Sequence, residues 1–131
     1  MVLTQPLTAM AEHDFVALTT FRRNGEPVPT PVWIAVDGDA LVVTTPATSG
    51  KVKRLRRDPR VEMRPCSRRG TVPDGAPLVT GVAEVVAPDD ASSRALRVKY
   101  GWQYRLVTTV EKLLNRRNRE RVIVRITSGV S

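Results

Sequence analysis

Apolar and polar positions alternate along much of this chain in the way that predicts short β-strands separated by turns. Six stretches combine β-branched or aromatic residues with this alternation, and each is bounded by Gly, Pro, Asn, Asp or Ser. The first three follow one another with no room for a crossover connection, so we expect antiparallel pairing. The predicted strands are 15–21, 28–36, 40–45, 61–66, 78–86 and 122–126.

The turns between the early strands carry clear signals. Asn24-Gly25 predicts a hairpin between the first two strands, and Asp37-Gly38-Asp39 predicts a second hairpin. Prolines at 27, 29 and 31 cannot donate to a sheet ladder, so the second strand is expected at an edge or locally unpaired near its start. Gly81, inside the fifth strand, suggests a bulge or bend.

Helical spacing of apolar residues appears between these strands. A short helix is predicted over 7–14, with Thr8 as a possible cap, and Pro88-Asp89-Asp90 is typical of a helix start that leads through 91–99. Gly101 interrupts the pattern before helical periodicity resumes over 104–114. Strands with helices inserted between them favour a small barrel, or a sheet with helices gathered at its ends.

The most informative stretch is the basic block that follows the third strand. Thr48 or Ser49 is placed to cap a helix, and Val52 and Leu55, three residues apart, share its inward face. Pro59 ends the helix, because the residue before a proline avoids helical dihedrals.

The charges of this block oppose the helix dipole. Lys51, Lys53 and Arg54 crowd the amino end, which is already positive, while Asp58 lies at the negative end. Each such charge costs roughly 0.3–1 kcal/mol, and an anion bound at that end would reverse the cost. The block is therefore interpreted as an anion site. A solvated basic surface is the alternative.

The length, net charge and cysteine content of the chain limit the possible functions further. The 131 residues suit one domain over 1–131, and a net charge of +8 indicates an anionic partner without naming it. Cys66 is the only cysteine, which excludes an internal disulfide and agrees with a reducing cytoplasm. No apolar run reaches the ~20 residues of a membrane span, and no secretion signal is evident.

Several common chemistries lack their motifs. No Gly-x-Gly-x-x-Gly follows a strand, no phosphate loop of the Gly-Lys-Ser/Thr type occurs, and no His, Cys and acidic cluster suggests a metal site. The single histidine, His13, sits near a predicted helix end and is a weak catalytic candidate. If the protein is an enzyme, a cofactor must carry the reaction.

Three segments together resemble a known family: 28–33 (VPTPVW), the turn 37–39, and 49–61 (SGKVKRLRRDPRV). The chain is similar to the split β-barrel flavin- and deazaflavin-binding oxidoreductases related to pyridoxamine phosphate oxidase. Within them it resembles the small actinobacterial branch that uses coenzyme F420. The likeness extends over 15–126. It implies a mainly β fold with inserted helices, a six-stranded antiparallel split β-barrel like that of FMN-binding protein.

The resemblance also implies roles for residues. The helix after the third strand would hold the cofactor phosphate and the second strand would face the ring. The family is homodimeric with sites between the subunits, so Tyr100, Trp102 and Tyr104 are candidates to reach the partner's site, and Tyr100 and Tyr104 are candidate proton donors. The implied phosphate ligands are Ser49, Gly50, Lys51 and Lys53, and the implied ring contacts are Thr30, Pro31 and Val32.

The surplus of positive charge distinguishes two cofactors. FMN presents one phosphate, whereas F420 also carries a chain of glutamates that arginines can pair with. Arg54 and Arg57, with Arg60 or Arg68 as further candidates, are expected to meet that chain.

Three function classes follow. The first is an F420-dependent reductase that passes hydride to an unsaturated small-molecule acceptor, with FMN as the alternative cofactor. The second is a non-catalytic deazaflavin-binding or storage protein. The third, a nucleic-acid binder, is weakest, because the aromatic residues do not interleave with the basic ones as stacking platforms would. The sequence does not name the acceptor.

Overall fold

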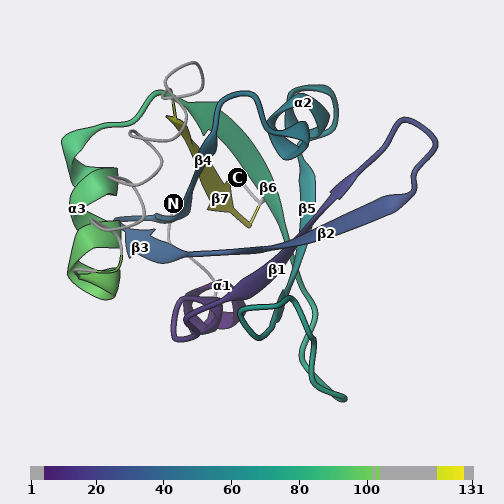
Figure 1. Ribbon diagram of the computed structural model, residues 1–131, viewed down its shortest axis with the longest axis horizontal. Coiled ribbons are helices and arrows are strands. Elements are labelled where there is room, and N and C mark those ends of the chain that lie inside the picture. Colours follow the sequence, from purple (N-terminus) through teal and green to yellow (C-terminus); the bar gives the residue numbers. More distant parts are fainter. Residues whose placement is uncertain (1–4, 102, 104–120, 129–131) are drawn as a thin grey trace.

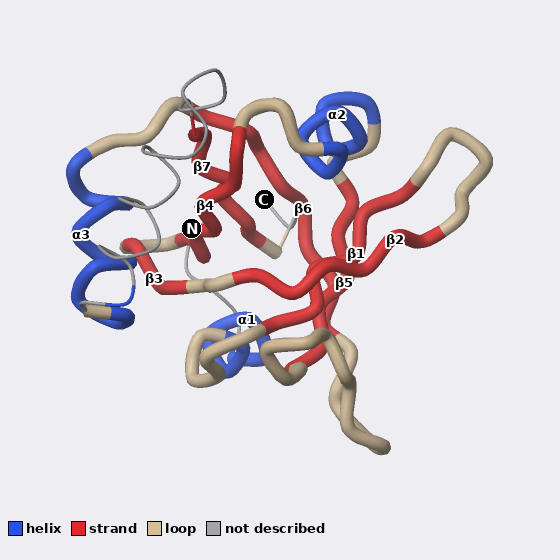
Figure 2. The backbone as a smooth tube through the Cα atoms, viewed as in Figure 1, coloured by secondary structure: helices blue, strands red, loops and turns tan. Residues whose placement is uncertain are grey.

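The computed structural model describes residues 5–101, 103 and 121–128, and its main element is one antiparallel sheet (Figures 1 and 2). In the described part of the chain the sheet has seven strands in the order β2-β1-β5-β6-β7-β4-β3, and every neighbouring pair is antiparallel. The strands are β1 (Val16–Phe21), β2 (Pro27–Val32), β3 (Ala35–Asp37), β4 (Ala40–Pro46), β5 (Arg60–Pro65), β6 (Val79–Val86) and β7 (Arg121–Thr127).

Three helices accompany the sheet (Figure 1). They are α1 (Gln5–Met10), α2 (Gly50–Arg57) and α3 (Asp90–Tyr100). The sheet is a half-barrel, with α1 below it, α2 above it and α3 beside β3 in the view of Figure 1. The mainly β, antiparallel prediction is confirmed, but the count of six strands is wrong.

The seventh strand arises because the predicted strand 28–36 is broken at Trp33 and Ile34. The backbone of Ile34 is held by α3: its N–H donates to the Tyr100 hydroxyl at 2.8 Å, and Lys99 Nζ donates to its carbonyl at 2.5 Å. Side chains from 65 and 66 residues further along the chain therefore take the place of ladder hydrogen bonds. β2 and β3 become the two ends of the sheet, so the prediction of an edge position for the proline-rich strand is confirmed.

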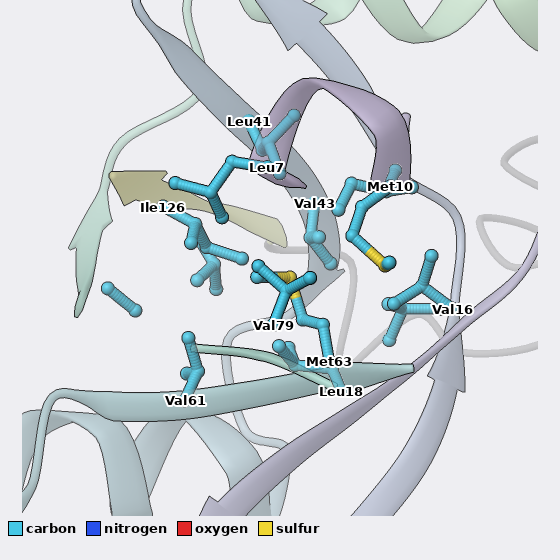
Figure 3. Close-up of a cluster of buried hydrophobic side chains, with 14 of the residues drawn as sticks. Leu7, Met10, Val16, Leu18, Leu41, Val43, Val61, Met63, Val79 and Ile126 are labelled. Carbon is cyan, nitrogen blue, oxygen red and sulfur yellow. The ribbon is translucent and has the colours of Figure 1, made fainter. Parts of the chain in front are cut away.

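The main core lies within the curve of the sheet (Figure 3). Leu18, Met63, Val43 and Ile126 meet there from four strands, and α1 adds Leu7 and Met10. A smaller cluster beneath α3 is formed by Ala35, Val42, Leu96, Tyr100 and Ile123. Burying each large side chain contributes roughly 1.5–3 kcal/mol, so these clusters fix how the helices sit on the sheet.

Several local predictions need correction. α1 ends at Met10 rather than at 14, and Thr8 lies inside it rather than at its cap. Gly81 causes no bulge, since its register with Val61 is continuous. A Cβ at Gly81 would lie 2.8 Å from the Thr127 carbonyl oxygen, so close approach of β7 explains this glycine.

Other local predictions are confirmed. Both hairpins form, with Gly25 and Gly38 at positive φ. Asp89 caps α3 by accepting a hydrogen bond from the Ser92 N–H at 2.7 Å. The helix predicted over 104–114 lies outside the described residues. None of the helices in the described part of the chain is long and apolar enough to cross a membrane.

Candidate functional site: a cation cluster beside the first hairpin

α2 is positioned by its two apolar residues. Val52 and Leu55 are buried, as predicted, and the helix contacts β1 and β6. Ser49 occupies the N-cap, but its side chain accepts no hydrogen bond from an early amide and instead lies 3.3 Å from the Thr45 hydroxyl. The prediction of a side-chain cap is therefore wrong, because the Ser49 hydroxyl is hydrogen-bonded to the Thr45 hydroxyl near the end of β4 instead of to a helix amide.

The placement of charge along α2 also differs from the prediction. The helix has eight residues, so Arg54, Arg56 and Arg57 all fall in its last turn, where the dipole favours cations. Only Lys51 and Lys53 belong to the first turn, which contains no acidic residue. Arg54 nevertheless reaches back over the amino end: a Cβ built on Gly50 would lie 2.8 Å from its Nη1.

Two arginines of α2 are held against the end of β1. Arg54 Nε donates to the Thr20 hydroxyl at 2.6 Å, and Arg57 Nη2 donates to the Phe21 carbonyl at 2.9 Å. Burial, followed by the nearby charges of Arg22 and Arg57, lowers the pKa of Arg54. Arginine stays protonated throughout the accessible pH range, so Arg54 keeps its charge in spite of burial and the two like charges.

Lys51 lies on the other side of the helix start. It is half-buried, and its Nζ donates to the Thr45 hydroxyl at 3.4 Å. Burial, followed by the charges of Arg54 and Arg121, lowers the pKa of Lys51. Arg121, at the start of β7, donates from Nε to the Thr44 hydroxyl at 2.9 Å. Lys53, by contrast, is exposed.

We call Lys51, Arg54 and Arg57 the cation cluster. Among the described residues, none of the three has a carboxylate within salt-bridge distance. Thr20 and Thr45, two buried polar side chains, serve as neutral acceptors for Arg54 and Lys51 instead. Crowded cations with neutral partners fit an anion, because a bound negative charge would relieve their mutual repulsion.

The other basic candidates lie apart from the cluster. Arg60 is paired with Asp58 at 2.8 Å and its guanidinium lies over the Phe21 ring. Arg68 lies over the ring of Phe15, at the opposite end of β1 from Arg57. The structure therefore brings Arg54 and Arg57 together with Lys51 but not Arg68.

The three predicted ring contacts alternate in direction along β2. Pro31 is exposed and lies against Gly70, where a Cβ would be 3.6 Å from the proline Cδ. Thr30 and Val32 belong to the opposite face, and Val32 packs into the main core. The Thr30 hydroxyl is buried with no hydrogen-bond partner among the described residues. An unpaired buried hydroxyl costs about 1–3 kcal/mol, so a polar partner at this position would be stabilising.

Tyr100 is placed as a structural residue. Its hydroxyl accepts from Ile34 N–H and donates to the Asp14 carbonyl at 2.8 Å, and its ring stacks on Trp33 with centroids 4.7 Å apart. Burial raises the pKa of Tyr100 to about 12. Its hydroxyl is fully used within the protein, which argues against a role as proton donor. Trp102 and Tyr104 lie outside the described residues.

Sequence reasoning missed Thr20, Thr45 and Arg121 as neighbours of the cluster. Thr20 lies near the end of β1 and Thr45 near the end of β4. The alternation of these strands is equally compatible with an exposed threonine, so the sequence pattern did not mark either residue. The packing of α2 against β1 makes their hydroxyls reachable by the cations.

Comparisons with known proteins place the fold. A sequence profile of the family described as Pyridoxamine 5'-phosphate oxidase matches residues 5–128. No curated protein matches the chain. Among solved structures, a conserved hypothetical protein from Mycobacterium tuberculosis is 26% identical with a TM-score of 0.64, over 99% of this chain and 83% of that one.

Two further structures have similar folds, and their names indicate different activities. A protein named F420 Reductase is 20% identical with a TM-score of 0.62, over 98% of this chain and 97% of that one. A heme storage protein from Vibrio cholerae is 12% identical with a TM-score of 0.65, over 100% and 93%. At these identities the likeness is one of fold, and the fold alone does not choose the ligand.

Proposed function

The chain belongs to the pyridoxamine 5'-phosphate oxidase family, and on that basis we propose that it is an oxidoreductase dependent on the deazaflavin coenzyme F420. In this proposal hydride passes from the reduced coenzyme to an unsaturated organic acceptor. The observation that carries the proposal is the cation cluster, which has no carboxylate partner among the described residues. The similar fold of a protein named F420 Reductase supports the choice.

The amino end of α2 would hold the phosphate. Gly50 is the first residue of the helix, where the dipole favours an anion, whereas the Ser49 N–H already donates to the Pro46 carbonyl at 3.1 Å and leaves only the Ser49 hydroxyl for the phosphate. Lys51 adds a half-buried charge there, and burial, followed by the charges of Arg54 and Arg121, lowers its pKa, so an anion at this place would stabilise its charged form. Lys53, exposed on the same turn, would contribute longer-range attraction.

The two arginines of the cluster would meet the glutamate chain. Hydrogen bonds to Thr20 and the Phe21 carbonyl already fix the directions of both guanidiniums, so little freedom is lost when a carboxylate binds. Arg60 is already paired with Asp58, which makes it a weaker candidate. A single phosphate at the helix start would engage Lys51 and Arg54 and leave Arg57 without an anionic partner, and this favours F420 over FMN.

The second strand would carry the ring. The unpaired hydroxyl of Thr30 is the described group that most needs a polar partner at that place. The bound coenzyme would supply the hydride, and the protein would hold ring and acceptor in contact while excluding water. We further propose a homodimer with a site at each subunit boundary. Tyr104 remains a candidate proton donor within this proposal.

Binding titrations test the proposal. We expect oxidised F420 to bind the wild-type protein and Lys51→Ala to weaken that binding by at least tenfold, the equivalent of one lost charged contact. Arg56→Ala is the matched control, because it removes an equal charge from the exposed side of the same helix. Equal losses in the two variants would reduce the site to general electrostatic attraction and contradict the proposal.

Two alternatives are separated by further titrations. Coenzyme with a shortened glutamate chain should bind Arg57→Ala and wild type equally, whereas full-length coenzyme should bind the variant more weakly. Equal wild-type affinity for F420 and FMN would favour an FMN-binding oxidoreductase. A protein that binds reduced F420 but never oxidises it with any unsaturated acceptor would be a storage protein.

A further inference from the structure

The outer edge of β2 has an unusual hydrogen-bonding composition that follows from its register. Pro27, Pro29 and Pro31 stand opposite Phe21, Thr19 and Ala17 of β1. In an antiparallel ladder, opposite pairs alternate between those that exchange hydrogen bonds and those that do not. Prolines have no N–H, so the three proline pairs must be the second kind.

The consequence is a rim of acceptors. In pairs that exchange no hydrogen bonds, the backbone groups of each residue point away from the partner strand. β2 is an end strand of the sheet, so the groups of these prolines point away from the sheet. The outer edge therefore presents three carbonyls and not one N–H. We call this edge the proline rim.

The carbonyls of the rim have no hydrogen-bond donor among the described residues, although the Pro31 ring lies against Gly70. All three prolines are exposed. Outside the β1–β2 ladder, no described group donates to their carbonyls. Prolines also protect an edge strand from pairing with another chain. This protective role does not determine how the carbonyls interact with a ligand that lies along the strand. That interaction depends on which hydrogen-bond donors and acceptors the ligand has.

The rim also lies in line with the cation cluster. Arg54 binds Thr20, which stands opposite Val28, at one end of β2. Pro31 is three residues further along, about 10 Å at roughly 3.3 Å per residue. The cluster lies on the β1 side of β2, so a phosphorylated ligand seated there would have to cross β2 near Val28 for its ring system to lie beside Pro29 and Pro31.

Flavin and deazaflavin rings differ at one atom in how they meet such a rim. Oxidised FMN has a nitrogen at ring position 5 whose lone pair accepts hydrogen bonds, whereas a deazaflavin has a C–H there. A rim without N–H groups leaves the nitrogen unpaired and faces it with other acceptors, which is unfavourable. A C–H has no lone pair to satisfy and tolerates a carbonyl contact.

We propose that the proline rim selects the cofactor: the carbonyl edge at Pro29 and Pro31 favours a ring with C–H at position 5 and disfavours oxidised FMN. The proposal rests on the proposed function, because it places the ring along β2. It adds a specificity device that is separate from the cation cluster, since it acts on the ring and not on the anionic end.

The test uses a probe that changes only this atom. FMN and 5-deaza-FMN carry the same phosphate and no glutamate chain, so their dissociation constants, measured by fluorescence titration, isolate ring position 5. We expect the wild-type protein to bind 5-deaza-FMN about three- to tenfold more tightly, the range that one neutral hydrogen bond provides. Equal affinity for the two probes would overturn the proposal.

Variants then assign the preference to the rim. Replacing both prolines, Pro29→Ala with Pro31→Ala, returns two N–H donors to the edge and should tighten FMN binding until the preference disappears. Pro27→Ala restores a donor at the far end of the same edge and should leave the preference unchanged. A preference that persists in the double variant would place selection elsewhere. If the wild-type protein bound neither probe nor F420, the proposed function itself would fail.

Discussion

Replacing Tyr100 by phenylalanine tests whether the strand break between β2 and β3 is held by one hydroxyl. The Tyr100 hydroxyl accepts from the Ile34 N–H at 2.8 Å and donates to the Asp14 carbonyl at 2.8 Å. Lys99 already donates to the Ile34 carbonyl, so the single hydroxyl proton is available for Asp14. Phenylalanine keeps the ring that stacks on Trp33 and removes only these two hydrogen bonds.

The magnitude follows from burial. Ile34 is 0% exposed and Tyr100 is 7% exposed, so the orphaned N–H has no access to water. A buried unsatisfied donor costs about 1–3 kcal/mol. With the lost contact to Asp14, we expect Tyr100→Phe to lower the free energy of unfolding by about 2–3 kcal/mol. For a chain of this size that lowers the Tm by roughly 6–12 °C.

The assay has three readouts. Urea unfolding gives the change in free energy, with Thr80→Val as control because it removes an exposed hydroxyl at a cost expected within about 0.5 kcal/mol. Amide hydrogen exchange should show faster exchange at Ile34 in the variant, with protection kept within β1.

The pH dependence supplies the third readout. Burial raises the pKa of Tyr100 from 10 to about 12, so the folded state favours the neutral hydroxyl. The stabilisation by Tyr100 is complete below pH 10 and is lost as the pH rises toward about 12. The stability gap between wild type and Tyr100→Phe should narrow only in that window. An unchanged free energy in the variant, with unchanged exchange at Ile34, would refute the role assigned to the hydroxyl.

Three further predictions concern packing, charge and the thiol. Gly81→Ala should cost about 1–3 kcal/mol in urea unfolding, because its Cβ would meet a backbone oxygen at 2.8 Å, whereas Gly50→Ala meets only the movable Arg54 side chain and should be tolerated. Lys51→Met should raise the Tm at pH 7, because the lowered pKa of Lys51 means that its charged form is disfavoured in the folded state. The gain in Tm should vanish as the pH rises toward 10.5, where the lysine loses its charge in both states. A gain that persisted at that pH would contradict this reasoning. Burial raises the pKa of the Cys66 thiol, so alkylation at pH 8, followed by mass spectrometry, should be slower in the folded protein than in urea; equal rates would contradict it.

Local signals in the sequence were enough to predict most of the fold. Turn residues, strand alternation and helix ends each act over a few residues, so both hairpins, the helix start at 88–90 and the edge position of the proline strand are confirmed. The break at Trp33 and Ile34 could not be predicted in this way. Its cause is Lys99 and Tyr100, whose contacts with Ile34 exist only once α3 has packed beside β3.

The candidate site divides in the same manner. The basic block and the inward face of α2 could be predicted, because charge and the spacing of apolar residues are properties of a few neighbouring residues. The hydroxyl partners of the cations were not, since Thr20 and Thr45 come from different strands and meet α2 only through the sheet. The direction of the Arg54 side chain was likewise set by packing. Arg54 belongs to the last turn of α2, but its guanidinium lies near Gly50 at the amino end of the helix.

These contacts together give β2 fixed supports at both ends. At one end its partner strand is tied to α2 through Thr20 and the Phe21 carbonyl, and at the other the chain is tied to α3 through Ile34. A strand held at both ends and barred from further pairing by its prolines is a rigid surface rather than a mobile edge. Because a ring laid along it would be positioned by the strand itself, Tyr100→Phe should weaken cofactor binding as well as stability, although its hydroxyl is fully used within the protein. Unchanged cofactor affinity in a folded Tyr100→Phe variant would show that the ring does not depend on this end of β2.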